Sequence, residues 1–168
     1  MNVDNLIIEV TRRCNLSCEH CLRGKAQNLD IKKGTIENFL VNSNVEYISS
    51  VTFTGGEPTL NIQAINDFID ICQVNNIDVG SFYIVVNGVT VPDEFILVAA
   101  RLFAFCSDNE ISQICVSESD FYYGQNEEEI NKLELFKIFS KKTTSEAKYL
   151  IKEGNAIEIG RASCRERV

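Results

Sequence analysis

Apolar residues along the chain follow two different periods, and each period predicts a different element. Short runs rich in β-branched residues predict β-strands, while apolar positions three or four residues apart predict amphipathic helices. Four strands are expected, at residues 6–10, 47–54, 82–86 and 114–117. Helices are expected at residues 35–42, from Asn61 to about Cys72, from Pro92 to about Cys106, and from Asn126 onward, with a last helix between Thr143 and Gly154.

Polar residues mark the starts of several predicted helices. Asn61 stands where the cap of the second helix is expected. Asn126 with Glu129, and Thr143 with Glu146, have the spacing of a capping box, in which each side chain binds the other residue's backbone N–H.

Strand and helix thus alternate four times, which predicts an α/β fold with a parallel sheet and right-handed crossovers. The unusual residues follow these strands, at residues 14–21, 55–58, 87–88 and 117–120. Because the carboxyl ends of parallel strands meet at one edge of a sheet, we expect these four segments to converge in space.

Three cysteines follow the first predicted strand in the spacing C-x3-C-x2-C, at Cys14, Cys18 and Cys21. Cysteine thiolates are the usual ligands of iron–sulfur clusters, and three of them leave one iron of a cubane cluster open to another ligand. In a reducing compartment, clustered cysteines indicate metal ligands rather than disulfides. The sequence therefore predicts an iron–sulfur site in this loop.

The cysteine loop and the segment Gly-Gly-Glu-Pro after the second strand together resemble the radical S-adenosylmethionine (radical SAM) superfamily. The resemblance extends from residue 5 to about residue 120. It implies a partial (β/α)6 TIM-like barrel with about four β/α units present. It also implies a [4Fe-4S] cluster on the three cysteines and S-adenosylmethionine (SAM) on the open iron. Reductive cleavage of SAM would then give a 5′-deoxyadenosyl radical, which takes a hydrogen atom from a substrate.

The same resemblance places Gly55, Gly56, Glu57 and Pro58 at the SAM site. Glycines lack a Cβ, so their backbone can approach a cofactor closely and hydrogen-bond the SAM ammonium. The Glu57 carboxylate suits that ammonium or the fixing of the loop, and both roles stay open.

Further candidates lie near the same edge. His20 stands where the family usually has an aromatic residue, and would pack beside the cluster or the adenine. Asn87 either contacts SAM or only makes the turn. Ser117 stands where the family contacts the SAM ribose or carboxylate, with Glu118 and Asp120 as further acidic candidates.

An alternative function is a non-catalytic zinc-binding interaction module, in which His20 completes a Cys3His site. Two neighbouring ligands, His20 and Cys21, would strain a tetrahedral site. The acidic residues 127–129 are expected to be a solvated helix start rather than a site.

Composition limits the partners and the location. The chain has 168 residues, 45% of them hydrophobic, enough for one domain. A formal charge of −8 argues against general nucleic-acid binding. The sequence has no apolar run long enough to cross a bilayer and no recognisable signal peptide. We therefore expect a cytoplasmic location and no association with a membrane. The resemblance implies an external electron donor, flavodoxin- or ferredoxin-like, and a peptide, protein or small-molecule substrate. Three further cysteines are expected to be buried hydrophobic side chains: Cys72, Cys106 and Cys115.

Residues 159–168 differ abruptly from the rest, since they are rich in arginine where residues 1–158 use mostly lysine. One reading frame of a widely used short-read sequencing adapter translates to these ten residues. We therefore expect residues 1–158 to be a radical SAM core domain cut short at its carboxyl end, and residues 159–168 to be read-through rather than native sequence. On that interpretation, two later strands of the barrel would be missing.

Overall fold

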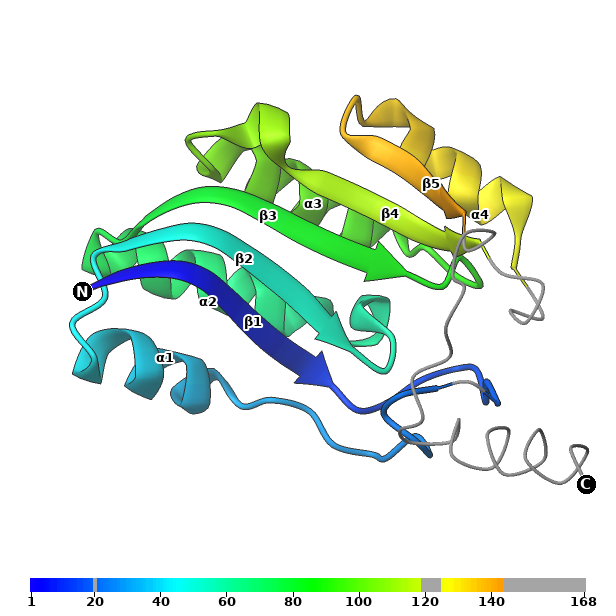
Figure 1. The fold of residues 1–168 in the computed structure, drawn as a ribbon, viewed down its shortest axis with the longest axis horizontal. Helices are drawn as coiled ribbons and strands as arrows, with labels where there is room; N and C mark the ends of the chain where they lie inside the picture. The colour runs from blue at the N-terminus through cyan, green and yellow to red at the C-terminus, as the bar shows by residue number, and fades with distance from the viewer. Residues whose placement is uncertain (20, 119–124, 144–168) are drawn as a thin grey trace, which may run out of the picture.

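A computed structural model of the chain describes residues 1–19, 21–118 and 125–143 (Figure 1). Within these residues, parallel strands form one sheet in sequential order: β1 (Asn2–Thr11), β2 (Tyr47–Gly55), β3 (Asp78–Val86), β4 (Gln113–Glu118) and β5 (Phe139–Thr143). The α-helices are α1 (Lys33–Asn42), α2 (Ile62–Asn75), α3 (Asp93–Phe105) and α4 (Glu127–Asn131). Three short 3-10 helices complete the elements: η1 (Pro58–Asn61), η2 (Asn109–Ile111) and η3 (Lys132–Leu135).

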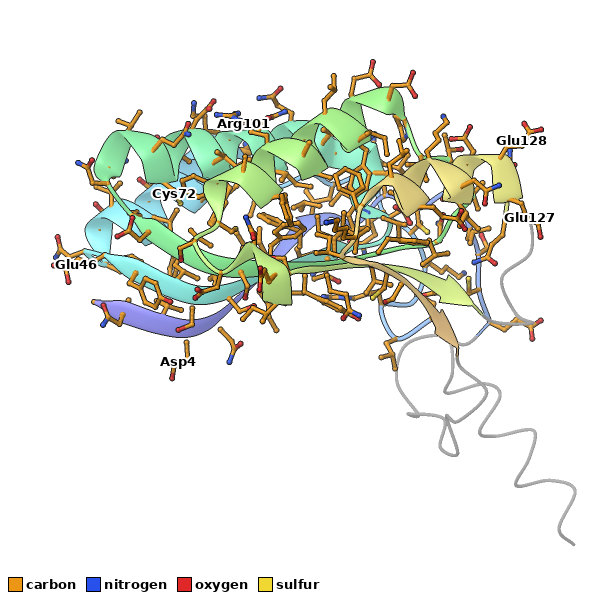
Figure 2. All side chains as sticks on the ribbon, turned by 90° about the horizontal axis from the view of Figure 1, so that it is seen from above. Asp4, Glu46, Cys72, Arg101, Glu127 and Glu128 are labelled. Atoms are coloured by element: carbon orange, nitrogen blue, oxygen red, sulfur yellow. The ribbon has the colours of Figure 1, made fainter. Side chains whose placement is uncertain are left out.

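Sequential strand order places the α-helices on one face of the sheet, because right-handed crossovers between neighbouring strands all return on the same side. Figure 2 shows the α-helices above the sheet, and no helix of the described residues covers its other face. This is the arrangement of part of a (β/α) barrel, in which the open face would line the interior. The expected α/β partial barrel is thus confirmed.

The core lies between the sheet and the helices. Phe53 of β2 and Phe68 of α2 pack edge to face with their ring centroids 5.3 Å apart, and both are buried. Arg101 of α3 lies on the outer side of the helix layer (Figure 2), where it binds Asp70 of α2 at 2.5 Å. Packing against the sheet buries one apolar stripe of each helix. The residues of this stripe recur at helical spacing, which is why the sequence predicted α2 and α3.

The described residues form five strands, whereas four were predicted for the chain. β5 pairs with β4 from Ile114↔Phe139 to Glu118↔Thr143, so β4 is not an edge strand. The sequence of β5 is Phe-Ser-Lys-Lys-Thr, which is too short and too polar to stand out as a strand. Thr143, predicted to open a helix, is the last residue of β5, while Glu146 and Gly154 lie outside the described residues.

The predicted helix caps are confirmed in part. Asn61 makes no side-chain cap bond to α2 and instead donates from Nδ2 to the Val10 carbonyl at 2.7 Å. Asn126 does cap α4, by accepting from the Glu128 N–H at 3.0 Å. The expected partner Glu129 does not complete a capping box, because its carboxylate accepts from the Val91 N–H at 2.7 Å.

The three cysteines that were predicted to be buried are buried: Cys72, Cys106 and Cys115. Burial raises the pKa of Cys72 and of Cys106 to about 12, so both are neutral thiols packed in the core. In the described part of the chain, no helix has the length and apolar character needed to cross a membrane.

Candidate functional site

The cysteine loop and the Gly-Gly-Glu-Pro segment are joined by backbone hydrogen bonds where β1 and β2 end. The Gly56 N–H donates to the Thr11 carbonyl at 2.8 Å, and the Glu57 N–H donates to the Arg13 carbonyl at 2.8 Å. These bonds continue the pairing of the two strands beyond the sheet. The two sequence motifs therefore converge at the carboxyl edge, as the strand pattern predicted.

Both glycines are required by this close approach. A Cβ at Gly55 would lie 2.2 Å from the Thr11 carbonyl oxygen. A Cβ at Gly56 would lie 2.2 Å from the Arg13 carbonyl oxygen and 3.0 Å from the Cys14 Cβ. The missing side chains thus face the backbone of the cysteine loop, a packing reason that the sequence did not reveal.

Glu57 is a buried carboxylate, with 1% of its surface exposed. Its Oε1 accepts from the Thr59 N–H at 3.1 Å and from the Thr59 hydroxyl at 2.8 Å, while Oε2 accepts from the Asn87 N–H at 2.8 Å. Burial raises the pKa of Glu57 above its ordinary value, and these hydrogen bonds oppose the rise. Of the two roles open from sequence, the geometry shows Glu57 fixing its own loop and the loop after β3.

Asn87 connects three loops at this edge and is 6% exposed. Its Oδ1 accepts from the Val89 N–H at 3.0 Å, which makes the turn predicted for Asn-Gly. Its Nδ2 donates to the Asn15 Oδ1 at 2.7 Å and lies 4.0 Å from the Cys14 Sγ. Asn87 therefore makes the turn and also contacts the cysteine loop.

Gln125 is a member of the site that sequence reasoning missed. Its Nε2 donates to the Asn87 carbonyl at 2.9 Å and to the Ser117 carbonyl, so it ties the end of β3 to the end of β4. Nothing in the sequence distinguishes this glutamine from a loop residue. Ser117, a predicted SAM contact, is half-buried in β4 at the same edge.

Arg13 and Asp30 were also missed, and they anchor the base of the cysteine loop. The Arg13 guanidinium binds the Asp30 carboxylate at 2.9 Å and also donates to the Leu60 carbonyl. The hydrogen bond from Arg13 holds the pKa of Asp30 below its ordinary value. The Thr11 hydroxyl donates to the same carboxylate at 2.5 Å. These bonds fix the loop at both ends, because Asp30 follows the last cysteine.

The three loop cysteines line one cavity of about 1000 Å³, which Gly56 also lines. All three thiols are half-buried and none is in a disulfide. The Cys21 N–H donates to the Cys18 carbonyl at 3.2 Å, and the Leu16 N–H donates to the Cys14 Sγ at 3.5 Å. The loop thus turns back on itself around the cavity.

Burial raises the pKa of the Cys14 and Cys18 thiols, and the neighbouring acidic groups raise both further: Glu57 and Cys21 at Cys14, and Cys14 and Cys21 at Cys18. A bound cation would lower the pKa of these thiols, because it favours the thiolate. Among residues 1–19, 21–118 and 125–143, no three Cys, Asp, Glu or His side chains converge closely enough to form a site for a single metal ion.

The donor set fits a cluster with an open iron. Three sulfur donors from one loop surround a cavity large enough for a cluster and more, and sulfur is the donor that iron–sulfur clusters require. Gly56 is the member of Gly-Gly-Glu-Pro that lines this cavity, whereas Glu57 and Pro58 are buried behind it.

Several of the predicted residues lie outside the part of the chain that the structure describes: His20, Asp120 and the segment 159–168. Glu118 is the last residue of β4. Glu127 and Glu128 are exposed in the first turn of α4, as expected for a solvated helix start, whereas Glu129 is half-buried and accepts from the Val91 N–H.

Comparison with known proteins gives a family match and one curated relative. The family described as "4Fe-4S single cluster domain" matches residues 8–93. An uncharacterized protein of Methanocaldococcus jannaschii is 38% identical over 74 residues, which are 42% of this chain and 25% of that protein.

Solved structures share the fold. The structure of anSMEcpe with bound AdoMet and the Cp18Cys peptide gives a TM-score of 0.59 at 16% identity, and covers 83% of this chain and 42% of that chain. The structure of anSMEcpe with AdoMet alone gives a TM-score of 0.59 at 17% identity, and covers 83% of this chain and 43% of that chain. The chain thus spans a quarter of the curated relative and less than half of these solved proteins.

Proposed function

We propose a function for this chain from the premise that it belongs to the radical SAM family, since the 4Fe-4S single cluster domain matches just over half of its residues. Cys14, Cys18 and Cys21 bind the [4Fe-4S] cluster, and SAM binds beside it at the iron without a cysteine. The observation that carries this assignment is the set of three thiols from one loop around one cavity.

When bound, the cluster would supply the electron that cleaves the SAM sulfonium bond and yields a 5′-deoxyadenosyl radical for hydrogen abstraction. The protein's own task is to hold the ligands and exclude competing reactions. The bonds between Arg13 and Asp30 fix both ends of the cysteine loop. The Asn87 amide holds Asn15, next to the first cysteine, in place.

Gly55 and Gly56 support SAM binding through their backbone. An ammonium donates hydrogen bonds, so it needs acceptors, and the Gly56 N–H is already engaged with Thr11. The carbonyl oxygens of the glycines are therefore the groups proposed to bind the SAM ammonium. Glu57 and Pro58 do not line the cavity, and their role is to hold the backbone of the two glycines at its wall.

Ser117 and His20 complete the proposed SAM site, with Ser117 toward the ribose and His20 toward the cluster or the adenine. The proposal also requires a one-electron donor from outside the chain. That donor would reduce the cluster before each cleavage, because each cleavage takes one electron from the cluster.

Anaerobic reconstitution of the full chain with iron and sulfide tests the assignment. The expected product contains iron and acid-labile sulfide in equal amounts, and it releases 5′-deoxyadenosine when it is reduced and incubated with SAM. The Cys18→Ala variant, treated in parallel, should contain no intact cluster and release none. A protein that takes up zinc and no sulfide would instead support the zinc-binding module and contradict the proposal.

A further inference from the structure

Basic residues are concentrated around the cysteine loop of an otherwise acidic chain. Residues 12–33 contain six of the 16 Lys and Arg residues and two of the 24 Asp and Glu residues, a net charge of +4, while all other residues together carry −12. From residue 34 to residue 131 the sequence has 15 acidic residues and one basic residue, Arg101. A charge distribution this uneven orients the molecule toward an anionic partner.

The basic side chains lie around two neighbouring cavities, which share Arg12. Arg12, Arg23 and Lys25 line the cavity that contains the three cysteines. Arg12 also lines a second cavity of about 330 Å³ with Lys32. Lys33 follows at the start of α1 and is exposed. We call these five residues the basic surface: Arg12, Arg23, Lys25, Lys32 and Lys33.

Within the part of the chain that the structure describes, two of these cations form ion pairs and three do not. Glu9 binds Arg23 at 3.0 Å and Arg12 at 3.4 Å. Within the described residues, no carboxylate lies within ion-pair distance of the three lysines: Lys25, Lys32 and Lys33. Their charge is therefore available to a partner.

We propose that the basic surface docks an acidic protein that delivers single electrons to the cluster. This inference rests on the proposed function, which needs a donor from outside the chain. The transfer moves one electron from the donor to the cluster, so the donor is oxidised by one electron, and no bond is formed or broken. A donor seated here would lie against the loop that carries Cys14, Cys18 and Cys21.

Two features favour an acidic protein over a nucleic acid. Leu22 and Leu29 lie within the same segment and are 49% and 55% exposed, and apolar side chains among charges are typical of a protein interface. An extended nucleic acid would also continue past the basic surface onto strongly acidic flanks, which repel phosphates. A small protein with a local acidic face contacts the basic surface alone, and small interfaces are usual for electron transfer.

The test compares two reductants on the reconstituted full chain. Photoreduced flavodoxin, an acidic one-electron carrier, is the protein donor, and dithionite is the small-molecule reductant. The variant is Lys32→Glu/Lys33→Glu, which reverses two charges away from the cysteine cavity. A glutamate at the start of α1 also suits the helix dipole, so the variant should fold. The matched control is Lys137→Glu, an exposed lysine before β5 at the opposite end of the sheet.

We expect the double variant to be reduced by flavodoxin about tenfold more slowly than the parent at low ionic strength. Added salt should slow the parent toward the variant, since exposed charges are screened. Lys137→Glu should behave like the parent, and dithionite should reduce all three proteins at the same rate. Equal flavodoxin rates at low salt would overturn the docking surface. Equal slowing with dithionite would also overturn it, because the lysines would then act on the cluster itself.

A binding measurement separates this inference from the proposed function. Oxidised flavodoxin is titrated into the cluster-free chain and the heat of binding is recorded. Weaker binding by the double variant than by Lys137→Glu supports the surface even if the chain takes up no iron. Identical or absent binding in all three proteins contradicts the surface, whatever the reconstitution shows.

Discussion

The cysteine loop after β1 and the Gly-Gly-Glu-Pro segment after β2 lie side by side, and they differ in how their polar groups are satisfied. Glu57 is buried, and both of its oxygens accept hydrogen bonds from protein groups. The thiols of the cysteine loop are half-buried and line one cavity, and burial raises the pKa of Cys14 and of Cys18. In the Gly-Gly-Glu-Pro segment, hydrogen bonds within the protein satisfy the Glu57 carboxylate. In the cysteine loop, the thiols are sulfur donors for a ligand.

This difference indicates that the two loops have different roles: the cysteine loop binds a ligand, and the Gly-Gly-Glu-Pro segment holds the cysteine loop in place. A cluster binds only where its ligands can take up its geometry, and metal binding contributes to the folding of the loop that holds it. The neighbouring segment must then supply rigidity without the metal. Asn87 extends this frame, because it binds Glu57 through its backbone and Asn15 through its side chain. The comparison can be tested by changing one loop at a time.

The largest effect is expected from Cys18→Ala in the cysteine loop. Removing one of three thiolates leaves two irons without a protein ligand, so the cluster should be lost completely. The unfolding free energy of the metal-free protein should change little, since the thiol is half-buried. Iron and sulfide analysis after reconstitution checks the first point, and urea denaturation checks the second. Cys72→Ala is the control, and an iron content in Cys18→Ala equal to that of Cys72→Ala would contradict the ligand assignment.

A smaller but still large effect is expected from Gly56→Val in the neighbouring segment. The new side chain would overlap the Arg13 carbonyl and press on Cys14, so the two loops must separate. We expect a loss of about 3 kcal/mol or more in unfolding free energy, already without metal, and a lower cluster content.

Gly34→Ala is the matched control for that variant, because a Cβ at Gly34 meets nothing within 4 Å. It should be neutral or stabilise α1 by up to about 1 kcal/mol. If Gly56→Val kept the parent's stability and cluster and lost only SAM affinity, the glycine would face the cofactor rather than the cysteine loop.

The sequence predicted the cysteine loop and the strand ends correctly because short-range patterns encode them. Spacing identifies Cys14, Cys18 and Cys21, and β-branched runs identify β2 and β3. Their convergence followed from the topology of parallel strands. The family match then agreed with the cluster expected from these residues.

The sequence could not predict contacts between residues that are far apart in the chain. Glu57 and Asn87 are 30 residues apart, and nothing local shows that one accepts from the other. Gln125 reaches two carbonyls 38 and eight residues away. β5 was missed for a related reason: its sequence is weak, and it becomes a strand because β4 offers it a partner.

Glu57→Gln tests how much the buried Glu57 carboxylate contributes to holding together the loops after β2 and β3. The amide nitrogen of Gln cannot accept, so either the Asn87 N–H or the Thr59 donors lose their partner, at a cost of about 1–3 kcal/mol. Burial raises the pKa of Glu57, so the folded state holds the proton more tightly than the unfolded state does. Its contribution to stability is full below the unfolded pKa and is lost as the pH rises through the folded pKa.

The stability difference between parent and Glu57→Gln should therefore shrink as the pH rises from about 4 to 7, measured by urea denaturation. Groups shared by both proteins, such as Asp30 with its lowered pKa, cancel in this difference. Glu128→Gln, at an exposed position, should show a small difference that is constant with pH. A difference that grows with pH in Glu57→Gln would show that the hydrogen bonds outweigh burial.

The smallest effect is expected where the two loops meet, at Asn87. Asn87→Asp keeps the oxygen that accepts from the Val89 N–H, and replaces the nitrogen that faces Asn15 and the Cys14 sulfur. A carboxylate there disfavours an added electron on the cluster, and a lost N–H donor acts in the same direction, since hydrogen bonds to the sulfurs help set the potential. We expect a more negative reduction potential, equivalent to about a tenfold change in the equilibrium, which is about 59 mV for one electron. A redox titration followed by absorbance or electron paramagnetic resonance measures it.

Asn109→Asp is the control, since it makes the same chemical change at the opposite edge of the sheet, where the amide binds the Phe103 carbonyl. If both variants hold a full cluster and titrate at the parent's potential, Asn87 only makes the turn.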